Sequence, residues 1–337
     1  MSANCTAAPD AVPSDAGVAG IGVLLSFMIT AVISLLLSAS LVFQEARSTR
    51  NSSSSSSYQK PSVLRRKLLN AYSDQQILTG IGIQSVGLSQ AETITPYHFF
   101  LVWMLSLLSM AVHNATLLAL ARDFRRDWVL RWMRQLLMFA NLVFSCVYGV
   151  YVLQAVRRGL NNATFPVACA WRPETPDGPP PADSALSYVG TIAVIVGNVV
   201  IFALATWYLH SRALRFYVVF QVVGLLLMTA FAVGATVRVA LLADAFATPP
   251  IALRDAGEQQ WSFGQLLSVG MLVLPLVSTV EILRGEIKCA PPVAAEYDDD
   301  DKGRLLEGGQ ELRSNPRAGV DFQPNPFWGS QTNLFRK

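Results

Sequence analysis

Apolar residues in this chain gather into runs of about 20 that carry almost no charge, and no other feature constrains the fold as much. A run of that length, coiled as an α-helix, spans the ~30 Å hydrocarbon core of a bilayer. Charged residues make up 15% of the chain, against roughly 25% in soluble domains. We therefore expect an all-α polytopic transmembrane bundle. The apolar runs cover residues 18–43, 97–121, 135–156, 185–210, 216–242 and 263–283.

A weaker seventh stretch, SDQQILTGIGIQSVGL at residues 73–88, decides how often the chain crosses the bilayer. Ser73 followed by Gln76 has the spacing of a capping box, and Asp74 would lie in the first turn, where the helix dipole favours an acid. A helix is therefore predicted to start at Ser73. Glycine and glutamine dilute its apolar body, so hydropathy alone leaves open a full span or a re-entrant segment.

The distribution of basic residues favours a full span. Residues 44–72 hold six lysines and arginines, and residues 122–134 hold five. Such clusters mark cytoplasmic loops, so an even number of crossings must separate the two. This predicts seven helices, with the N-terminus outside and the C-terminus inside. The cytoplasmic segments then carry 21 of the 26 basic residues. The predicted regions are an outer tail at 1–17, a seven-helix domain at 18–283 and a disordered cytoplasmic tail at 284–337.

Several modifications follow from this topology as hypotheses. Asn4 and Asn162 begin N-glycosylation sequons on the predicted outer side. Cys5 and Cys169 would share that oxidising compartment, so a disulfide between them is possible, although connectivity does not follow from sequence. Cys289, just past the last helix, is either a palmitoylation site or an inert thiol.

Polar side chains inside the predicted spans are the usual indicators of function in a membrane protein. They serve either as hydrogen-bonding contacts between helices or as the lining of a pocket. No span carries a chain of carboxylates, and no HExxH, GxSxG or phosphate-binding loop is present. We expect no catalytic, cofactor or metal site. The intramembrane polar residues are His113, Asn114, Asn141, Asn198 and Gln221.

Two cytoplasmic features suggest partners besides the bilayer, and neither suggests nucleic acid. Residues 63–72 mix leucines with Arg65, Arg66 and Lys67. They would suit a helix on an anionic membrane surface, or plain positive-inside anchoring. The tripeptide Asn325-Pro326-Phe327 resembles the ligand of EH-domain endocytic adaptors, although so short a match also arises by chance.

Two stretches, DAGVAGIGVLLSF at 15–27 and YSDQQILTGIGIQSVGL at 72–88, resemble a group of uncharacterised multi-pass membrane proteins of filamentous ascomycete fungi. The resemblance covers the membrane core and omits the tail. It implies a fungal origin and a seven-helix fold, and it brings no activity and no site residues.

Three functions fit these observations. The first is a receptor-like or scaffolding protein without catalysis, in the plasma membrane or endomembrane system. The second is a membrane-embedded enzyme or accessory protein of a secondary-metabolite pathway, similar to terpene cyclases. This alternative lacks an intramembrane acidic pair to act as general acid. The third, a small-molecule transporter, lacks a visible internal repeat.

Overall fold

The computed structural model describes residues 5–51, 63–126, 128–160, 162–178, 184–210 and 217–284. Regular structure within these ranges is helical, apart from one isolated β-bridge between Val12 and Leu253. Two short 3-10 turns occur, η1 at Val167–Trp171 and η2 at Met271–Val273, and η2 joins the last two helices. The helices are α1 (Ile21–Asn51), α2 (Val63–Ser89), α3 (Pro96–Ala119), α4 (Ala121–Arg126), α5 (Trp128–Arg157), α6 (Ser184–His210), α7 (Tyr217–Leu242), α8 (Phe263–Gly270) and α9 (Leu274–Leu283).

In the part of the chain that the structure describes, six segments are long and apolar enough to cross a membrane, judged by length and composition. They are α1, α3, α5, α6, α7 and the α8–α9 unit. The expected all-helical fold is thereby confirmed, and these segments fit a membrane protein with several spans. At 27 residues, α2 is long enough, but its hydropathy leaves it out of this set. A seventh crossing therefore stays a prediction.

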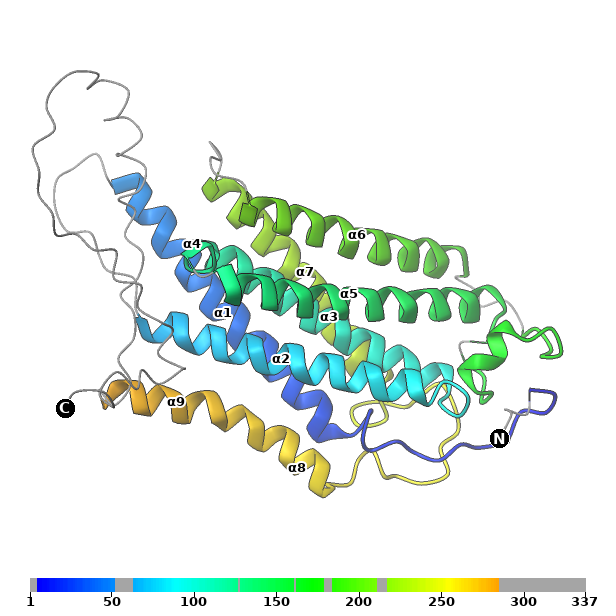
Figure 1. The fold of residues 1–337 in the computed structure, drawn as a ribbon. Coiled ribbons are helices and arrows are strands. Elements are labelled where there is room, and N and C mark those ends of the chain that lie inside the picture. Colours follow the sequence, from blue (N-terminus) through cyan, green and yellow to red (C-terminus); the bar gives the residue numbers. More distant parts are fainter. Residues whose placement is uncertain are drawn as a thin grey trace, which may run out of the picture.

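The centre of the bundle is α3, which packs against α1, α2, α5, α6 and α7 (Figure 1). The 18-residue apolar window of α3 is 100% buried, against 22% for α7 and 11% for the α8–α9 unit. Large apolar side chains are exposed along the outer helices, as lipid contact requires. Thr95 caps the start of α3 by accepting a hydrogen bond from the His98 backbone N–H, and Pro96 occupies the first turn.

The predicted start of α2 at Ser73 is wrong, because the helix begins at Val63. Ser73 and Asp74 lie in its interior, so neither acts as a cap. The predicted surface helix at residues 63–72 is instead the first part of α2. Its basic residues find partners inside the bundle. Arg65 donates to Gln44 of α1 at 2.6 Å, and Arg66 forms an ion pair with Asp123 of α4.

Two other helix boundaries also lie beyond the apolar runs, within stretches that contain basic residues. The first helix continues to Asn51, eight residues past the apolar run, and α5 begins at Trp128 within the basic stretch. Basic residues are good helix formers, so a helix can extend beyond its apolar part. Asn4, Cys289 and Asn325–Pro326–Phe327 lie outside the described residues, as does the tail from residue 285.

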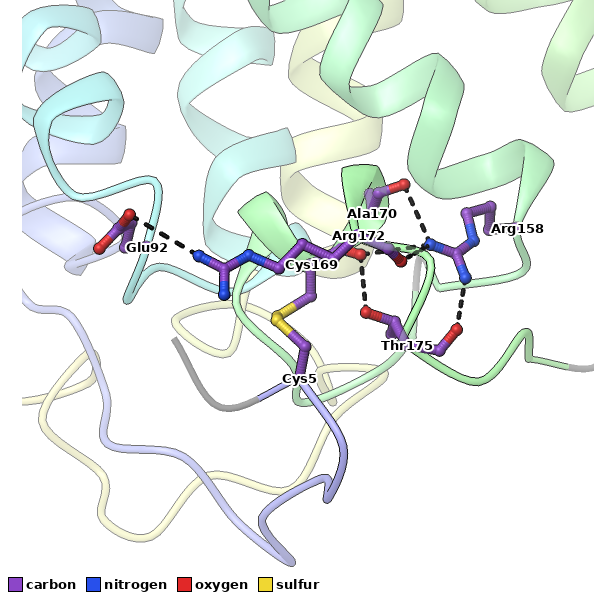
Figure 2. Close-up of a disulfide and its surroundings, with 7 residues drawn as sticks. All are labelled: Cys5, Glu92, Arg158, Cys169, Ala170, Arg172 and Thr175. Atoms are coloured by element: carbon purple, nitrogen blue, oxygen red, sulfur yellow. Dashed lines mark hydrogen bonds and ion pairs between the residues drawn. A yellow bond between two sulfur atoms is a disulfide. The ribbon is translucent and has the colours of Figure 1, made fainter. Parts of the chain in front are cut away.

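The two ends of the bundle differ in chemistry. One end, here called the arginine end, carries Arg65, Arg66, α4 and the start of α5. The opposite end, here called the disulfide end, carries the bond between Cys5 and Cys169, whose Cα atoms are 5.5 Å apart. This is the pairing that the sequence left open (Figure 2).

Arg158 organises the loop that holds Cys169 (Figure 2). Its guanidinium donates to the carbonyl oxygen of Arg172 at 2.6 Å and to that of Cys169 at 3.3 Å. It also donates to the Thr175 carbonyl and to the Asp177 carboxylate. The Thr175 hydroxyl donates to the Cys169 carbonyl at 2.8 Å. One arginine therefore contacts several carbonyls of this loop at once.

Candidate functional site

Five of the polar and small residues that lower the hydropathy of α2 share one buried face. Ser73, Gln76, Gly80, Gln84 and Gly87 recur every three or four residues and are all buried. The opposite side exposes Leu78 and Val86. The exposed side also carries Thr79, Gly82 and Ser85, and the buried side includes Ile77. Both sides of α2 are therefore mixed, and two of its glutamines, Gln76 and Gln84, are turned toward protein.

This buried face forms hydrogen bonds with α3 and α5. The Ser109 hydroxyl of α3 donates to the Gln76 carbonyl at 3.0 Å. On α5, Asn141 accepts from the Gln84 side chain, and the Tyr148 hydroxyl donates to the Gln84 carbonyl at 2.8 Å. Gly87 leaves the space that the Tyr148 hydroxyl occupies, since an added Cβ there would lie 2.2 Å from it.

The predicted intramembrane polar residues are all buried, but they do not gather into one cluster. His113 contacts Ser73, with 2.8 Å between Nδ1 and the hydroxyl oxygen. Gln221 of α7 donates to the Leu118 carbonyl at 2.9 Å. Neither side-chain amide atom of Asn114 has a partner among the described residues. Hydrogen bonding between helices describes Asn141 and Gln221 well. Asn198 is buried on α6.

A groove of about 270 Å³ opens between α1, α2 and α8. It starts at the disulfide end beside Gly17 and reaches Thr30 of α1 and Met271 of η2. The walls combine hydroxyl and amide groups with aliphatic and aromatic carbon. Gly82 widens the groove, because no atom lies within 4 Å of the position that its Cβ would take. The lining residues are Gly17, Val18, Val23, Ser26, Phe27, Thr30, Gln75, Gln76, Thr79, Gly82, Ile83, Val86, Leu267, Ser268 and Met271.

Two glutamines on the α2 wall contain buried polar atoms that have no described partner. Gln76, 2% exposed, has an unpartnered Nε2, and Gln75 has an unpartnered Oε1. One is a hydrogen-bond donor and the other an acceptor. Unpaired polar groups at this depth are costly, so the groove is suited to a ligand that supplies both an acceptor and a donor.

A buried polar cluster lies at the disulfide end of the bundle. Glu258 is fully buried in the loop between α7 and α8. Its carboxylate lies 2.6 Å from His98 Nε2 and accepts from the Tyr97 hydroxyl at 3.1 Å. The Ile21 backbone N–H donates to the Glu258 carbonyl at 3.0 Å. This loop therefore connects the start of α1 to the start of α3.

The same loop contains Asp244, whose pKa is raised by its partial burial and by the nearby Glu258 carboxylate. Gln259 donates to Asp244 and lowers the pKa in part. Glu258, His98 and Tyr97 were not among the sequence-predicted site residues. No local sequence pattern distinguishes a buried acid such as Glu258 from a solvated one.

Within the described residues, no group of three or more His, Cys, Asp or Glu side chains could hold a metal ion. No family model, no curated protein and no solved structure matches the chain. The function therefore has to be inferred from the groove and from the packing around it.

Proposed function

We propose that this chain is a receptor-like membrane protein that crosses the bilayer seven times and binds a small amphipathic molecule between α1, α2 and α8. The observation that carries the proposal is the groove itself. Its volume of about 270 Å³ is near the lower end for small-molecule sites, roughly 300–1,000 Å³. It combines an apolar wall with an unpartnered amide donor and acceptor.

Packing supports a crossing by α2. Its buried face lies against α3 and α5, so Gly80, Gln84 and Gly87 are enclosed by protein. Membrane helices tolerate such residues where they face other helices. The helix also runs beside α3 from the arginine end to the disulfide end (Figure 1). A full span leaves both basic clusters on one side, as the positive-inside rule requires.

This topology places the disulfide end outside and the arginine end in the cytoplasm. Asn162 is exposed in the loop between α5 and α6, and we propose that it carries an N-glycan. Epitope tags inserted after Ser55 and after Asp127 test the topology in intact cells. Both tags are expected to become reachable only after permeabilisation. A single tag reachable from outside would reject the seven-crossing topology. Loss of an endoglycosidase-sensitive shift in Asn162→Gln tests the glycan.

Ligand binding is tested by identifying what co-purifies with the full-length protein. Native mass spectrometry should find a small molecule on the wild type that is lost in Gly82→Leu, because the leucine would fill the groove. Gly234→Leu is the matched control, since Gly234 of α7 is exposed and also has open space at its Cβ position. If the wild type carries no such molecule, or both variants retain it, the groove is not a ligand site. A scaffolding role without a ligand would then remain.

The enzyme alternative has no comparable support among the described residues. Asp74 is paired with Arg134, and Glu258 is buried between His98 and Tyr97. Neither carboxylate lines the groove, so neither is placed to protonate a molecule bound there.

A further inference from the structure

A second, smaller cavity lies at the arginine end, enclosed by α2, α3, α4, α5 and α6. Its volume is about 20 Å³, which is room for one water-sized group. The polar side chains around it are Ser73, Asp74, His113, Arg131, Arg134 and Gln135. The cavity shares no lining residue with the groove, although both are lined by residues between Ser73 and Ile77 of α2.

Two of these side chains are held in place by their neighbours. Arg134 forms an ion pair with Asp74, and its guanidinium carbon lies 4.8 Å from the ring centre of Phe124. The Ser73 hydroxyl is 2.8 Å from His113 Nδ1. When Ser73 donates this hydrogen bond, the neutral imidazole carries its own hydrogen on Nε2.

The cavity contains more buried donors than acceptors. His113 Nε2, Gln135 Nε2, Arg131 Nε and Arg134 Nε have no partner among the described residues. His113 is 4% exposed, Gln135 6% and Arg134 9%. The unpartnered acceptor that lines the cavity is Gln135 Oε1. Native proteins pair nearly all such buried groups, so a hydrogen-bond acceptor is missing from this cavity.

The charge of the lining favours an anionic acceptor over water. Arg131 and Arg134 bring two positive charges, and Asp74 is the one carboxylate among the lining residues. A water molecule could accept from two donors but would leave the remaining positive charge unbalanced. Phosphate and carboxylate groups are too large for a cavity of this volume.

We propose that this cavity binds a monatomic anion, with chloride as the ligand, held by Arg131, Arg134, His113 and Gln135. The anion would link α3 and α5 at the arginine end, and α2 would be joined to it through the Asp74–Arg134 ion pair. The inference does not depend on the groove or on its ligand.

The test uses the purified full-length protein in detergent and the line width of the ³⁵Cl resonance, which broadens when chloride exchanges with a protein site. The wild type should broaden the line in a saturable way, and bromide should compete while gluconate does not. Arg131→Gln and Gln135→Leu should each weaken chloride binding at least tenfold. Arg157→Gln, at the other end of α5, is the matched control and should bind as the wild type does.

Thermal unfolding gives a second measurement that does not depend on the variants. At constant ionic strength, replacing gluconate with chloride should raise the unfolding midpoint of the wild type and saturate at the same concentration as the line broadening. Absence of broadening and of this shift, or equal binding by all four proteins, would mean that the cavity holds water only. The proposal would then be wrong.

Discussion

Gly80 of α2 lies directly against Ser109 of α3, so that a Cβ added at Gly80 would be 2.5 Å from the Ser109 hydroxyl oxygen and 3.0 Å from its Cβ. The same hydroxyl donates to the Gln76 carbonyl one turn away. The glycine that makes α2 look weakly apolar is therefore what allows α2 and α3 to pack closely.

The first prediction concerns this contact. Gly80→Ala should destabilise the bundle by about 1–3 kcal/mol, because the added methyl group overpacks the interface. Gly82→Ala is the control in the same helix, and it meets no atom within 4 Å. It should be neutral or stabilising by up to about 1 kcal/mol. Unfolding in detergent with increasing denaturant would compare the two. Equal destabilisation of both variants would contradict the packing of α2 described above.

The second prediction concerns Glu258. Glu258→Ala removes the acceptor for His98 and Tyr97 in a fully buried site, so it should cost roughly 2–5 kcal/mol. Glu258→Gln keeps one acceptor oxygen and should cost less. Glu92→Gln is the control, because Glu92 is exposed and 4.0 Å from Arg172, and it should change stability by less than about 1 kcal/mol. Thermal unfolding midpoints measure all three. A Glu258→Ala protein as stable as the control would contradict the prediction.

The third prediction concerns the disulfide. The bond joins residues 164 positions apart, so Cys5→Ser and Cys169→Ser should each reduce stability by about 2–4 kcal/mol. The double variant should match either single one, since both remove the same bond. Cys146→Ser serves as the control because Cys146 is a free thiol on α5. Non-reducing peptide mapping and unfolding in detergent would check the pairing and its effect. Additive losses in the double variant would mean that the two cysteines act separately.

The fourth prediction is a pH dependence in the N-terminal segment. Hydrogen bonds from the Ser14 hydroxyl and from the Gly257 backbone N–H lower the pKa of Asp255. A lowered pKa in the folded state contributes stability that is present above the ordinary aspartate value, about 3.9, and is lost as the pH falls through the folded value. Protease resistance of residues 5–17 should therefore be constant near neutral pH and decrease under strongly acidic conditions.

Ser14→Ala should move that decrease to a higher pH, because the hydroxyl that stabilises the ionised carboxylate is gone. Asp10→Asn leaves this contact in place and should keep the wild-type profile. If Ser14→Ala and the wild type lose protection at the same pH, the Ser14–Asp255 bond does not control the segment.

The apolar spans were predictable because burial in lipid imposes a signal at every position of a 20-residue run. The helix boundaries were not. Ser73 and Gln76 have capping-box spacing, but the same spacing occurs inside α2, where Ser73 contacts His113 and Gln76 accepts from Ser109. A motif four residues long cannot distinguish a helix start from a helix interior when the preceding residues also favour a helix.

The candidate site was less predictable than the fold. The groove is formed by three helices whose sequences share no pattern. In the sequence of α2 alone, its glutamines only lower the hydropathy of an apolar segment and do not indicate a binding site. Likewise, the contact between His98 and Glu258 joins residues 160 positions apart. The pairing of Cys5 with Cys169 could be proposed from the sequence as one possibility, because the predicted topology places both cysteines in one compartment.

The complete burial of α3 has a consequence for how the chain is made. This helix leaves the ribosome after α1 and α2 but before α5, α6 and α7, which cover the rest of its surface. During synthesis the side of α3 that packs against α5, α6 and α7 stays uncovered until these helices are made. Ser106, for example, gains its hydrogen bond to Ser145 only when α5 is in place. Truncated chains that stop before α7 should therefore depend on insertion chaperones and be degraded quickly.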